Sequence, residues 1–351
     1  MEGHIIDTNR NNFFMLYADC IPVKGYTRTM ICDTANGELF FVDNTYYDLI
    51  LELRELTIGE VAAMLGEDDL PEFATFLEQM TAGDLGTFVE DPGLFPPIAE
   101  EWDSPFRITD AIIDIRDKQH DYNGLFDQLN ALLCPYVQIR SYAEQSPEAL
   151  NAILSAYDKL SEFRHIEIVL KYPEDFDENG YRNILSDYRM VSLTFYASKN
   201  DREIAHHRMS FIKQTFSSCE QCGIINKKSM SLPGLSSFME HKNHNSCLNR
   251  KISIDESGRI KNCPSMKKDY GDADNVPLAE VLKDRAFTGL WDIRKDQIKV
   301  CKDCEFRYIC SDCRAYVEDP SDIYSKPLKC SYDPYTGQWE ETMHEHQKAI
   351  L

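Results

Sequence analysis

Short apolar runs separated by polar breaks open the chain between residues 11 and 42. The runs FFMLYA, YTRTMICD and ELFFVD have the length and the aromatic and branched residues that are typical of strands. We expect a turn at residues 22–25 (PVKG). Asn36 and Gly37 lie between two apolar runs, which predicts a β-hairpin.

Helical spacing replaces this pattern between residues 44 and 82. Asn44 is expected to cap the helix TYYDLILELREL, Thr57 is expected to cap IGEVAAML, and Pro71 opens EFATFLEQM. The run LGTFVED then returns as a strand. Residues 1–98 are therefore predicted to form a small winged-helix-like α+β module. An α+β cap that binds no ligand is the alternative interpretation.

Strand and helix patterns alternate after a linker rich in proline and glycine at residues 91–97. Strands AIIDI, YVQIRSY, HIEIVLKY and MVSLTFYAS are followed by helices NGLFDQLNALL, PEALNAILSAYDKLSEF, NGYRNILSDY and REIAHHRMSFIKQTF. Four such repeats predict an α/β fold with a parallel sheet and crossover helices over residues 105–218. This stretch is too short for an eight-unit barrel, so a partial (β/α) barrel is expected.

Cysteines dominate the pattern of residues 219–351. Two pairs are separated by two residues each, and three single cysteines lie at a distance; these seven are Cys247, Cys263, Cys301, Cys304, Cys310, Cys313 and Cys330. The runs KISI and RIKN flank Gly258 and predict a hairpin that brings Cys247 and Cys263 together. Two close pairs with distant single cysteines suit two metal centres better than one.

The composition of the chain limits which cellular compartment and which classes of partner are expected. No stretch of the 351 residues approaches 18 consecutive apolar residues, and no signal peptide opens the chain, so a cytoplasmic protein without a membrane span is expected. In that compartment, clustered cysteines favour metal over disulfides. The net charge of −22 argues against a nucleic-acid partner and is compatible with a basic peptide.

The cysteine-rich stretch resembles the SPASM domain, a C-terminal module of many radical SAM enzymes that mature peptides. The pattern of that family (a Cys, a Gly with a second Cys five residues later, a four-Cys group and a last Cys) is filled here. In one departure, the last interval of the four-Cys group is two residues, where several relatives have three. The run CEFRYICSDCRAY, the following KPLKC and Trp339 are similar to the SPASM-domain peptide maturase of the grasp-with-spasm systems. The partner in those systems is an ATP-grasp ligase that acts on a ribosomally made precursor peptide.

This resemblance implies two auxiliary [4Fe–4S] clusters. The first would be held by Cys247, Cys263 and Cys313, together with Cys219 or Cys222 from the CxxCG turn. The second would be held by Cys301, Cys304, Cys310 and Cys330. If every ligand is a thiolate, neither cluster has an open iron, which favours electron-transfer or structural roles. Zinc held by four thiolates is the alternative.

The resemblance also implies what this chain lacks. Radical SAM enzymes hold their SAM-binding cluster with C-x3-C-x2-C in the loop after the first barrel strand, whereas residues 116–122 (RDKQHDY) contain no cysteine. The nearest, Cys134, is isolated, and the stretch SYAEQSPE lacks the Gly-Gly-Glu of relatives. SAM binding is therefore not expected, and the middle region is interpreted as a degenerate scaffold. No catalytic residue is assigned, and whether the chain is a maturase or an accessory protein stays open.

The N-terminal module is similar to the leader-peptide recognition domains fused to peptide-maturation enzymes, in which the peptide adds a strand to a sheet edge beside a helix. The chain shows no ATP-binding signature, so a ligase step would belong to a partner. Three hypotheses follow: a peptide-maturation protein that works with an ATP-grasp ligase, an iron–sulfur oxidoreductase that carries electrons, and a structural metal-stapled scaffold.

Other candidate residues have simpler interpretations. Surface or core roles are expected for the histidines His206, His207, His241 and His244. Cys20, Cys32 and Cys134 are expected to be small buried hydrophobes. Phe306 and Tyr308 are expected to pack over the metal site. Arg307 and Arg314 either donate toward cluster sulfurs, bind a partner's carboxylate, or form ordinary ion pairs.

Overall fold

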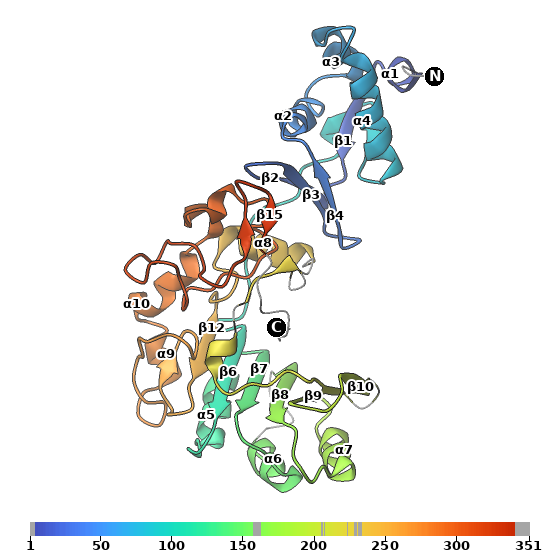
Figure 1. The fold of residues 1–351 in the computed structure, drawn as a ribbon. Helices are drawn as coiled ribbons and strands as arrows, with labels where there is room; N and C mark the ends of the chain where they lie inside the picture. The colour runs from blue at the N-terminus through green and yellow to red at the C-terminus, as the bar shows by residue number, and fades with distance from the viewer. Residues whose placement is uncertain are drawn as a thin grey trace.

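The computed structural model describes residues 4–340, except 157–162, 205, 207, 223, 228, 229 and 231–233. The N-terminal module, the cysteine-rich region and a large sheet follow one another along the long axis of the molecule (Figure 1). The mixed α/β class predicted from the sequence is confirmed. No helix among these residues is long and apolar enough to cross a membrane.

The N-terminal module has two small antiparallel sheets. Strand β1 (Phe13–Leu16) pairs with β5 (Gly86–Val89), and the second sheet has the order β2 (Cys20–Lys24), β3 (Thr29–Asp33), β4 (Glu38–Val42). The predicted turn at residues 22–25 is wrong, because Pro22 lies inside β2. A proline is tolerated there because β2 is an edge strand of its sheet.

The predicted hairpin at Asn36 and Gly37 is confirmed as the β3–β4 connection. Gly37 has a φ of 76°, which favours glycine, and the Asp33 carboxylate accepts hydrogen bonds from the backbone N–H groups of Ala35 and Asn36. Both features close the turn locally.

Helices α1 (His4–Thr8), α2 (Thr45–Glu52), α3 (Ile58–Met64) and α4 (Leu70–Ala82) complete this module. Thr57 caps α3 as predicted, in a capping box with Glu60. Asn44 precedes α2, but its side chain does not cap the helix. It bonds instead to Thr29 and to the carbonyls of Gly25 and Tyr26, and so holds the β2–β3 loop.

The large sheet has eight strands in the order β10-β11-β9-β8-β7-β6-β12-β13. Its centre is parallel: β6 (Asp110–Ile115), β7 (Tyr136–Ser141), β8 (His165–Lys171) and β9 (Val191–Tyr196). Helices α5 (Tyr122–Ala131), α6 (Pro147–Leu154) and α7 (Glu178–Asp187) connect these strands. The sheet is open, and its described strands do not close into a barrel. The rest of the predicted 147–163 helix falls largely on residues 157–162, outside the described residues.

The fourth predicted helix is wrong, because residues 202–211 form a hairpin. Strand β10 (Arg202–Ile204) pairs antiparallel with β11 (Met209–Phe211), and β11 pairs parallel with β9. Met209 and Phe211 are two residues apart, so both side chains reach the apolar face of the sheet, where they are buried. This burial explains why a strand forms there.

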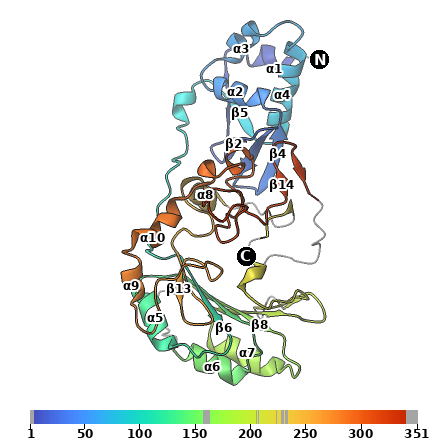
Figure 2. The same ribbon diagram turned by 60° about the vertical axis from the view of Figure 1, so that its left-hand side comes forward.

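The two faces of the sheet differ in polarity. Ile113, Ile139, Ile168 and Leu193 are successive partners across the central strands, and all are buried in one core with α5–α7. The helices therefore cover this face (Figure 2). The other face carries polar pairs, which are Arg140 with Asp114, Gln138 with Glu167, Thr194 with Glu167, and His165 with Ser192.

The predicted KISI/RIKN hairpin is confirmed as β12 (Lys251–Ile254) and β13 (Ile260–Lys261), with Gly258 at a φ of 87°. Strand β12 pairs parallel with β6, so the cysteine-rich region extends the large sheet. The buried side chains Ile252, Ile254 and Ile260 belong to the same core as the central strands. The cysteine-rich region and the sheet therefore share one hydrophobic core.

The rest of the cysteine-rich region consists of short elements. They are η3 (Cys219–Gln221), α8 (Leu235–Asn243), α9 (Leu278–Val281), α10 (Arg285–Thr288), η5 (Gly289–Asp292), η6 (Lys295–Gln297), η7 (Cys301–Asp303), β14 (Tyr332–Asp333) and β15 (Gln338–Trp339). A further short helix, η1 (Pro92–Leu94), lies in the linker between β5 and β6.

The N-terminal module is docked on the cysteine-rich region. Val23, Met30 and Cys32 pack in one buried cluster with Phe306 and Tyr308. The Arg28 guanidinium lies 2.8 Å from the carboxylate of Glu305, which is completely buried, and Tyr332 also donates to this carboxylate. The module is therefore part of the same packed body, and its removal would expose an apolar surface.

Candidate metal centres

None of the twelve cysteines is in a disulfide, and eight of them fall into two groups whose members affect one another's pKa. The first thiol group consists of Cys222, Cys247, Cys263 and Cys313. Burial raises the pKa of Cys247 to about 11, while Lys251 opposes the shift and the thiolates of Cys222 and Cys313 add to it. Each of these thiols therefore lies close enough to influence the charge of another.

The other members of the first thiol group show the same mutual effect. Burial raises the pKa of Cys263 to about 12, and the thiolates of Cys247 and Cys222 add to the increase. Burial also raises the pKa of Cys313, with Cys222 again contributing to the rise. The charge of Cys222 therefore raises the pKa of Cys247, Cys263 and Cys313, the three cysteines that the resemblance placed together.

Cys219 points to different neighbours. Burial raises the pKa of its thiol, Ser265 lowers it, and the charges of Asp114 and Arg140 also act on it. Cys219 and Cys222 both line a cavity of about 50 Å³ at the carboxyl ends of the central strands, together with Tyr196. The two cysteines of the CxxC turn therefore share this cavity, but only Cys222 is among the main causes of the pKa shifts of Cys247, Cys263 and Cys313.

The second thiol group consists of Cys301, Cys304, Cys310 and Cys330. Burial raises the pKa of Cys310 to about 12, Lys295 opposes this, and the thiolates of Cys330 and Cys301 add to it. Burial raises the pKa of Cys304 well above its usual value, and Cys310 adds to that shift. All four thiols are thus linked by their charges.

The backbone brings this group together from distant parts of the chain. Helix η7 begins at Cys301, after Val300, which has a left-handed φ of 68°. The backbone N–H of Cys304 donates to the carbonyl of Cys301 at 3.0 Å, which closes that CxxC turn. An isolated parallel bridge between Ile225 and Cys330 holds the last cysteine.

Each thiol group has a lysine whose charge acts on it. Burial alone would lower the pKa of Lys295, but the charges of Cys310 and Cys301 raise it well above its usual value. Its ammonium nitrogen lies 3.5 Å from the Cys310 sulfur. Burial likewise opposes the charge on Lys251, while Cys247 and Asp110 raise the pKa of this lysine.

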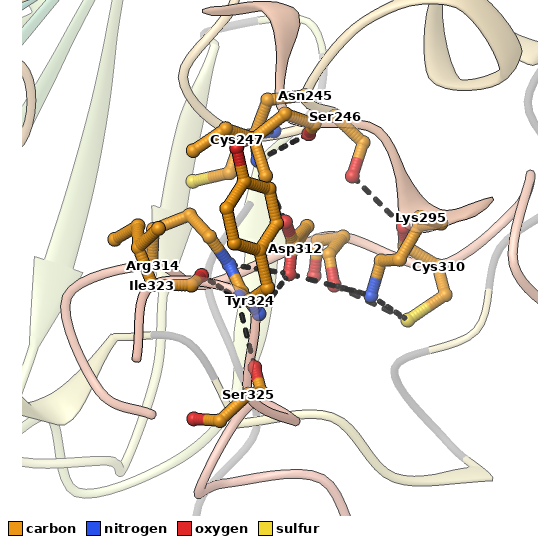
Figure 3. Close-up of polar contacts among 12 residues, drawn as sticks. Asn245, Ser246, Cys247, Lys295, Cys310, Asp312, Arg314, Ile323, Tyr324 and Ser325 are labelled. Atoms are coloured by element: carbon orange, nitrogen blue, oxygen red, sulfur yellow. Dashed lines mark hydrogen bonds and ion pairs between the residues drawn. The ribbon is translucent and has the colours of Figure 1, made fainter. Parts of the chain in front are cut away.

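A network of buried charges lies between the two thiol groups, centred on Asp312 (Figure 3). Arg314 donates to Asp312 through two nitrogens, at 3.1 and 2.7 Å, and the Lys295 ammonium lies 3.6 Å away. The Asn245 amide also donates to Asp312, at 2.6 Å. In the sequence, Asp312 lies between Cys310 of the second thiol group and Cys313 of the first. The network therefore holds the segment 310–313, which contributes a cysteine to each group.

Asn245 extends this network to the first thiol group. Its side-chain oxygen accepts hydrogen bonds from the backbone N–H groups of Cys247 and Leu248, and the neighbouring Ser246 donates to the carbonyl of Cys310. The sequence analysis did not identify Asn245, Lys295 or Asp312. Their burial is set by tertiary packing, which the sequence does not show. The only sequence signal for these residues was that they lie near cysteines or the CxxC motif.

The two groups have the donor chemistry of metal centres, since each contains four thiols, and thiolates are the ligands of iron–sulfur clusters and of structural zinc. Among the described residues, no group of three or more His, Cys, Asp or Glu side chains is arranged to hold a single metal ion. What the members of each thiol group share is that the charge of one thiolate raises the pKa of another.

The remaining predicted residues take structural positions. Cys20, Cys32 and Cys134 are buried as expected, and Phe306 and Tyr308 pack in the cluster that contains Cys310. Arg307 pairs with Asp296 and Arg314 pairs with Asp312, and among the described residues neither arginine donates to a sulfur.

The three candidate histidines that the structure describes are not among the main causes of any thiol pKa shift in either group. Nδ1 of His241 donates a hydrogen bond to the Tyr308 carbonyl, and burial lowers the pKa of this histidine to about 4. His244 packs against Trp102, and His206 is exposed. His207 lies outside the described residues.

Comparison with known proteins adds no assignment. No family model matches the chain, and no curated protein matches it.

Proposed function

We propose that this chain matures a ribosomally made peptide, with a SPASM-like region that holds two [4Fe–4S] clusters and a separate ATP-grasp ligase as its partner. The observation that carries the proposal is the completeness of the two thiol groups. Eight cysteines, spread over more than 100 residues, gather into two sets of four. The mutual pKa effects within each set support the use of these thiols as ligands of two clusters.

The chain's own residues suit such clusters. When bound, a cluster of this kind supplies one-electron transfer. Four thiolates bring more negative charge than the iron core offsets, and the ammonium groups of Lys251 and Lys295 compensate part of it. Asp312 holds both of the neighbouring ligand segments in place through Arg314 and Asn245.

We assign Cys222, rather than Cys219, as the fourth ligand of the first cluster. The Cys222 thiolate raises the pKa of Cys247, Cys263 and Cys313, whereas Cys219 is not among the main causes of any of these three shifts. With four thiolates each, both clusters would be fully ligated by the protein, which would suit electron transfer or a structural role.

The open parallel sheet serves in this proposal as a partial-barrel scaffold without SAM chemistry. The loop after β6, where radical SAM enzymes place their cluster, is instead tied to the cysteine-rich region by ion pairs. Arg116 lies 2.6 Å from Glu256, and Lys118 lies 2.9 Å from Asp274. Basic side chains in ion pairs occupy the loop that carries the thiolates in those enzymes.

The N-terminal module is the proposed binding site for the precursor. Strand β4 has no partner on its outer side among the described strands, and the opposite edge of that sheet carries Pro22, which cannot donate. Residues 1–98 hold 18 acidic and 4 basic side chains, a net charge of −14. We therefore expect an extended, basic segment of the precursor to add as a strand along β4.

Hydrogen exchange on the full chain tests this site. Short peptides encoded beside this chain's gene are synthesised and added, and amide exchange is compared with and without each peptide. Strand addition is expected to slow exchange at the outward-facing N–H groups of β4 (Glu38–Val42) and to leave β7 unchanged. Binding that protects another region, with β4 unaffected, would contradict the site.

A further inference from the structure

A basic pocket of about 410 Å³ lies where the linker meets the cysteine-rich region. The linker contributes Arg107, the start of β12 contributes Arg250, and the segment of α10 and η5 contributes Arg285 and Trp291. Figure 2 shows the linker passing α10 on its way to β6. The pocket contains none of the cysteines of the two thiol groups.

The charge of this pocket is opposite to that of the whole chain. Its lining includes the cations of Arg107, Arg250, Lys283 and Arg285, against the single carboxylate of Asp292. The chain as a whole carries a net charge of −22. A concentrated positive charge on an acidic protein attracts anions locally, since the field of a concave site is focused there.

Two of these cations have no partner of their own. Arg250 lies 3.1 Å from Asp103, and Lys283 lies 2.6 Å from Glu280, so their charges are partly neutralised. Arg107 and Arg285 are exposed and make no ion pair or hydrogen bond within the part of the chain that the structure describes. Their guanidinium groups remain available for an external oxyanion, which they can bind through two N–H groups each.

Two further nitrogen atoms of residues that line the pocket are buried and have no hydrogen-bond partner among the described residues. The indole N–H of Trp291 has no acceptor among the described residues, and Nδ1 of His244 has no hydrogen bond. The nearest carboxylate oxygen, on Asp292, is 3.7 Å from that nitrogen, which is too long for one. Buried polar groups without partners are uncommon, so their presence beside free arginines points to an absent acceptor.

We propose that this pocket binds an oxyanion, either a carboxylate of an acidic peptide or a phosphate. Arg107, from the linker, and Arg285, from α10, bind the anion, and the charge of Arg250 adds to the attraction. Both ligand sources offer the planar or tetrahedral oxygen groups that arginine recognises. The proposal goes beyond the peptide site at β4, and it stands without the assignment of either thiol group.

The test is isothermal titration calorimetry of the full, cluster-loaded chain with two probes, a hexaglutamate peptide and inorganic phosphate. The double variant Arg107→Gln/Arg285→Gln is compared with Arg189→Gln. That control removes one exposed arginine between α7 and β9. Strands β8, β7 and β6 separate β9 from β12, which contributes Arg250 at its N-terminal end to the pocket. All three arginines are exposed, so the variants are expected to fold like the parent chain.

At least one probe is expected to bind the parent chain and the Arg189→Gln control equally. Loss of two charge-assisted contacts should weaken its binding at least about tenfold in the double variant. The affinity should also fall as salt is raised, because exposed charges are screened. Binding of hexaglutamate but not phosphate would identify a peptide carboxylate as the ligand. Binding of phosphate but not hexaglutamate would identify a phosphate. Failure of both probes to bind, or equal binding by the double variant, would overturn the proposal.

Discussion

The large sheet and the cysteine-rich region are stabilised in different ways. The sheet buries aliphatic and aromatic side chains between its strands and three helices, and its backbone groups are paired strand to strand. The region from residue 289 to 340 has only short helices and one pair of two-residue strands. Its buried side chains include charged ones: Lys295, Glu305, Asp312 and Arg314.

The difference shows where the stability of each region originates. Apolar burial is sufficient for the sheet, because each buried side chain gains free energy on leaving water. The cysteine-rich region buries thiols and charges, which costs free energy unless these groups are paired or bound to metal. We therefore expect metal binding to supply folding free energy to this region and little to the sheet.

Replacing a ligand cysteine should produce the largest effect. Cys304→Ser removes one thiolate of the second group and is expected to cost roughly 5 kcal/mol or more, since a structural metal contributes folding energy outright. Thermal unfolding measures the loss. Amide hydrogen exchange should show faster exchange at 289–340, while β7 and β8 keep their protection.

The matched control is Cys134→Ser, a buried cysteine of the sheet. Its sulfur donates to the Tyr136 carbonyl, and a serine hydroxyl keeps that bond, so the cost should be about 1 to 2 kcal/mol with iron content unchanged. Equal losses in the two variants would remove the distinction between the regions.

The buried charge network should give a smaller effect. Asp312→Asn leaves the Arg314 and Lys295 cations without their carboxylate in a dry site, with an expected cost of about 3 to 5 kcal/mol. Asp296→Asn removes an ion pair with Arg307 at an exposed position and should cost less than about 1 kcal/mol. Chemical denaturation of both variants measures the two costs, and a small cost for Asp312→Asn would mean that the network does not stabilise this region.

Much of the sheet was predictable, because its pattern is local. The strands β6 to β9 and the helices between them follow from apolar periodicity, and the β3–β4 hairpin follows from Asn36-Gly37. The 202–211 hairpin was not predictable, because its short apolar run fits both periods until Met209 and Phe211 meet the edge of β9. The pairing of β12 with β6 joins distant segments and has no local signal.

The candidate site was predictable only as a set of cysteines. Their spacing and the resemblance divided seven of them into two sets, but they left Cys219 and Cys222 open. The distinction depends on which thiolate affects the pKa of Cys247, and this is set by the tertiary fold. Lys295 and Asp312 carry no signal of their own, since charged residues are usually exposed and their burial here comes from the surrounding turns.

Iron and acid-labile sulfide content, measured on protein purified without oxygen, tests the central claim most directly. The account predicts about eight iron and eight sulfide per chain, with a broad absorption band near roughly 400 nm. It also predicts that Cys222→Ser lowers the iron content toward half, whereas Cys219→Ser leaves it unchanged. One or two zinc ions without sulfide would contradict the iron–sulfur assignment, and equal iron loss in both variants would contradict the choice of Cys222.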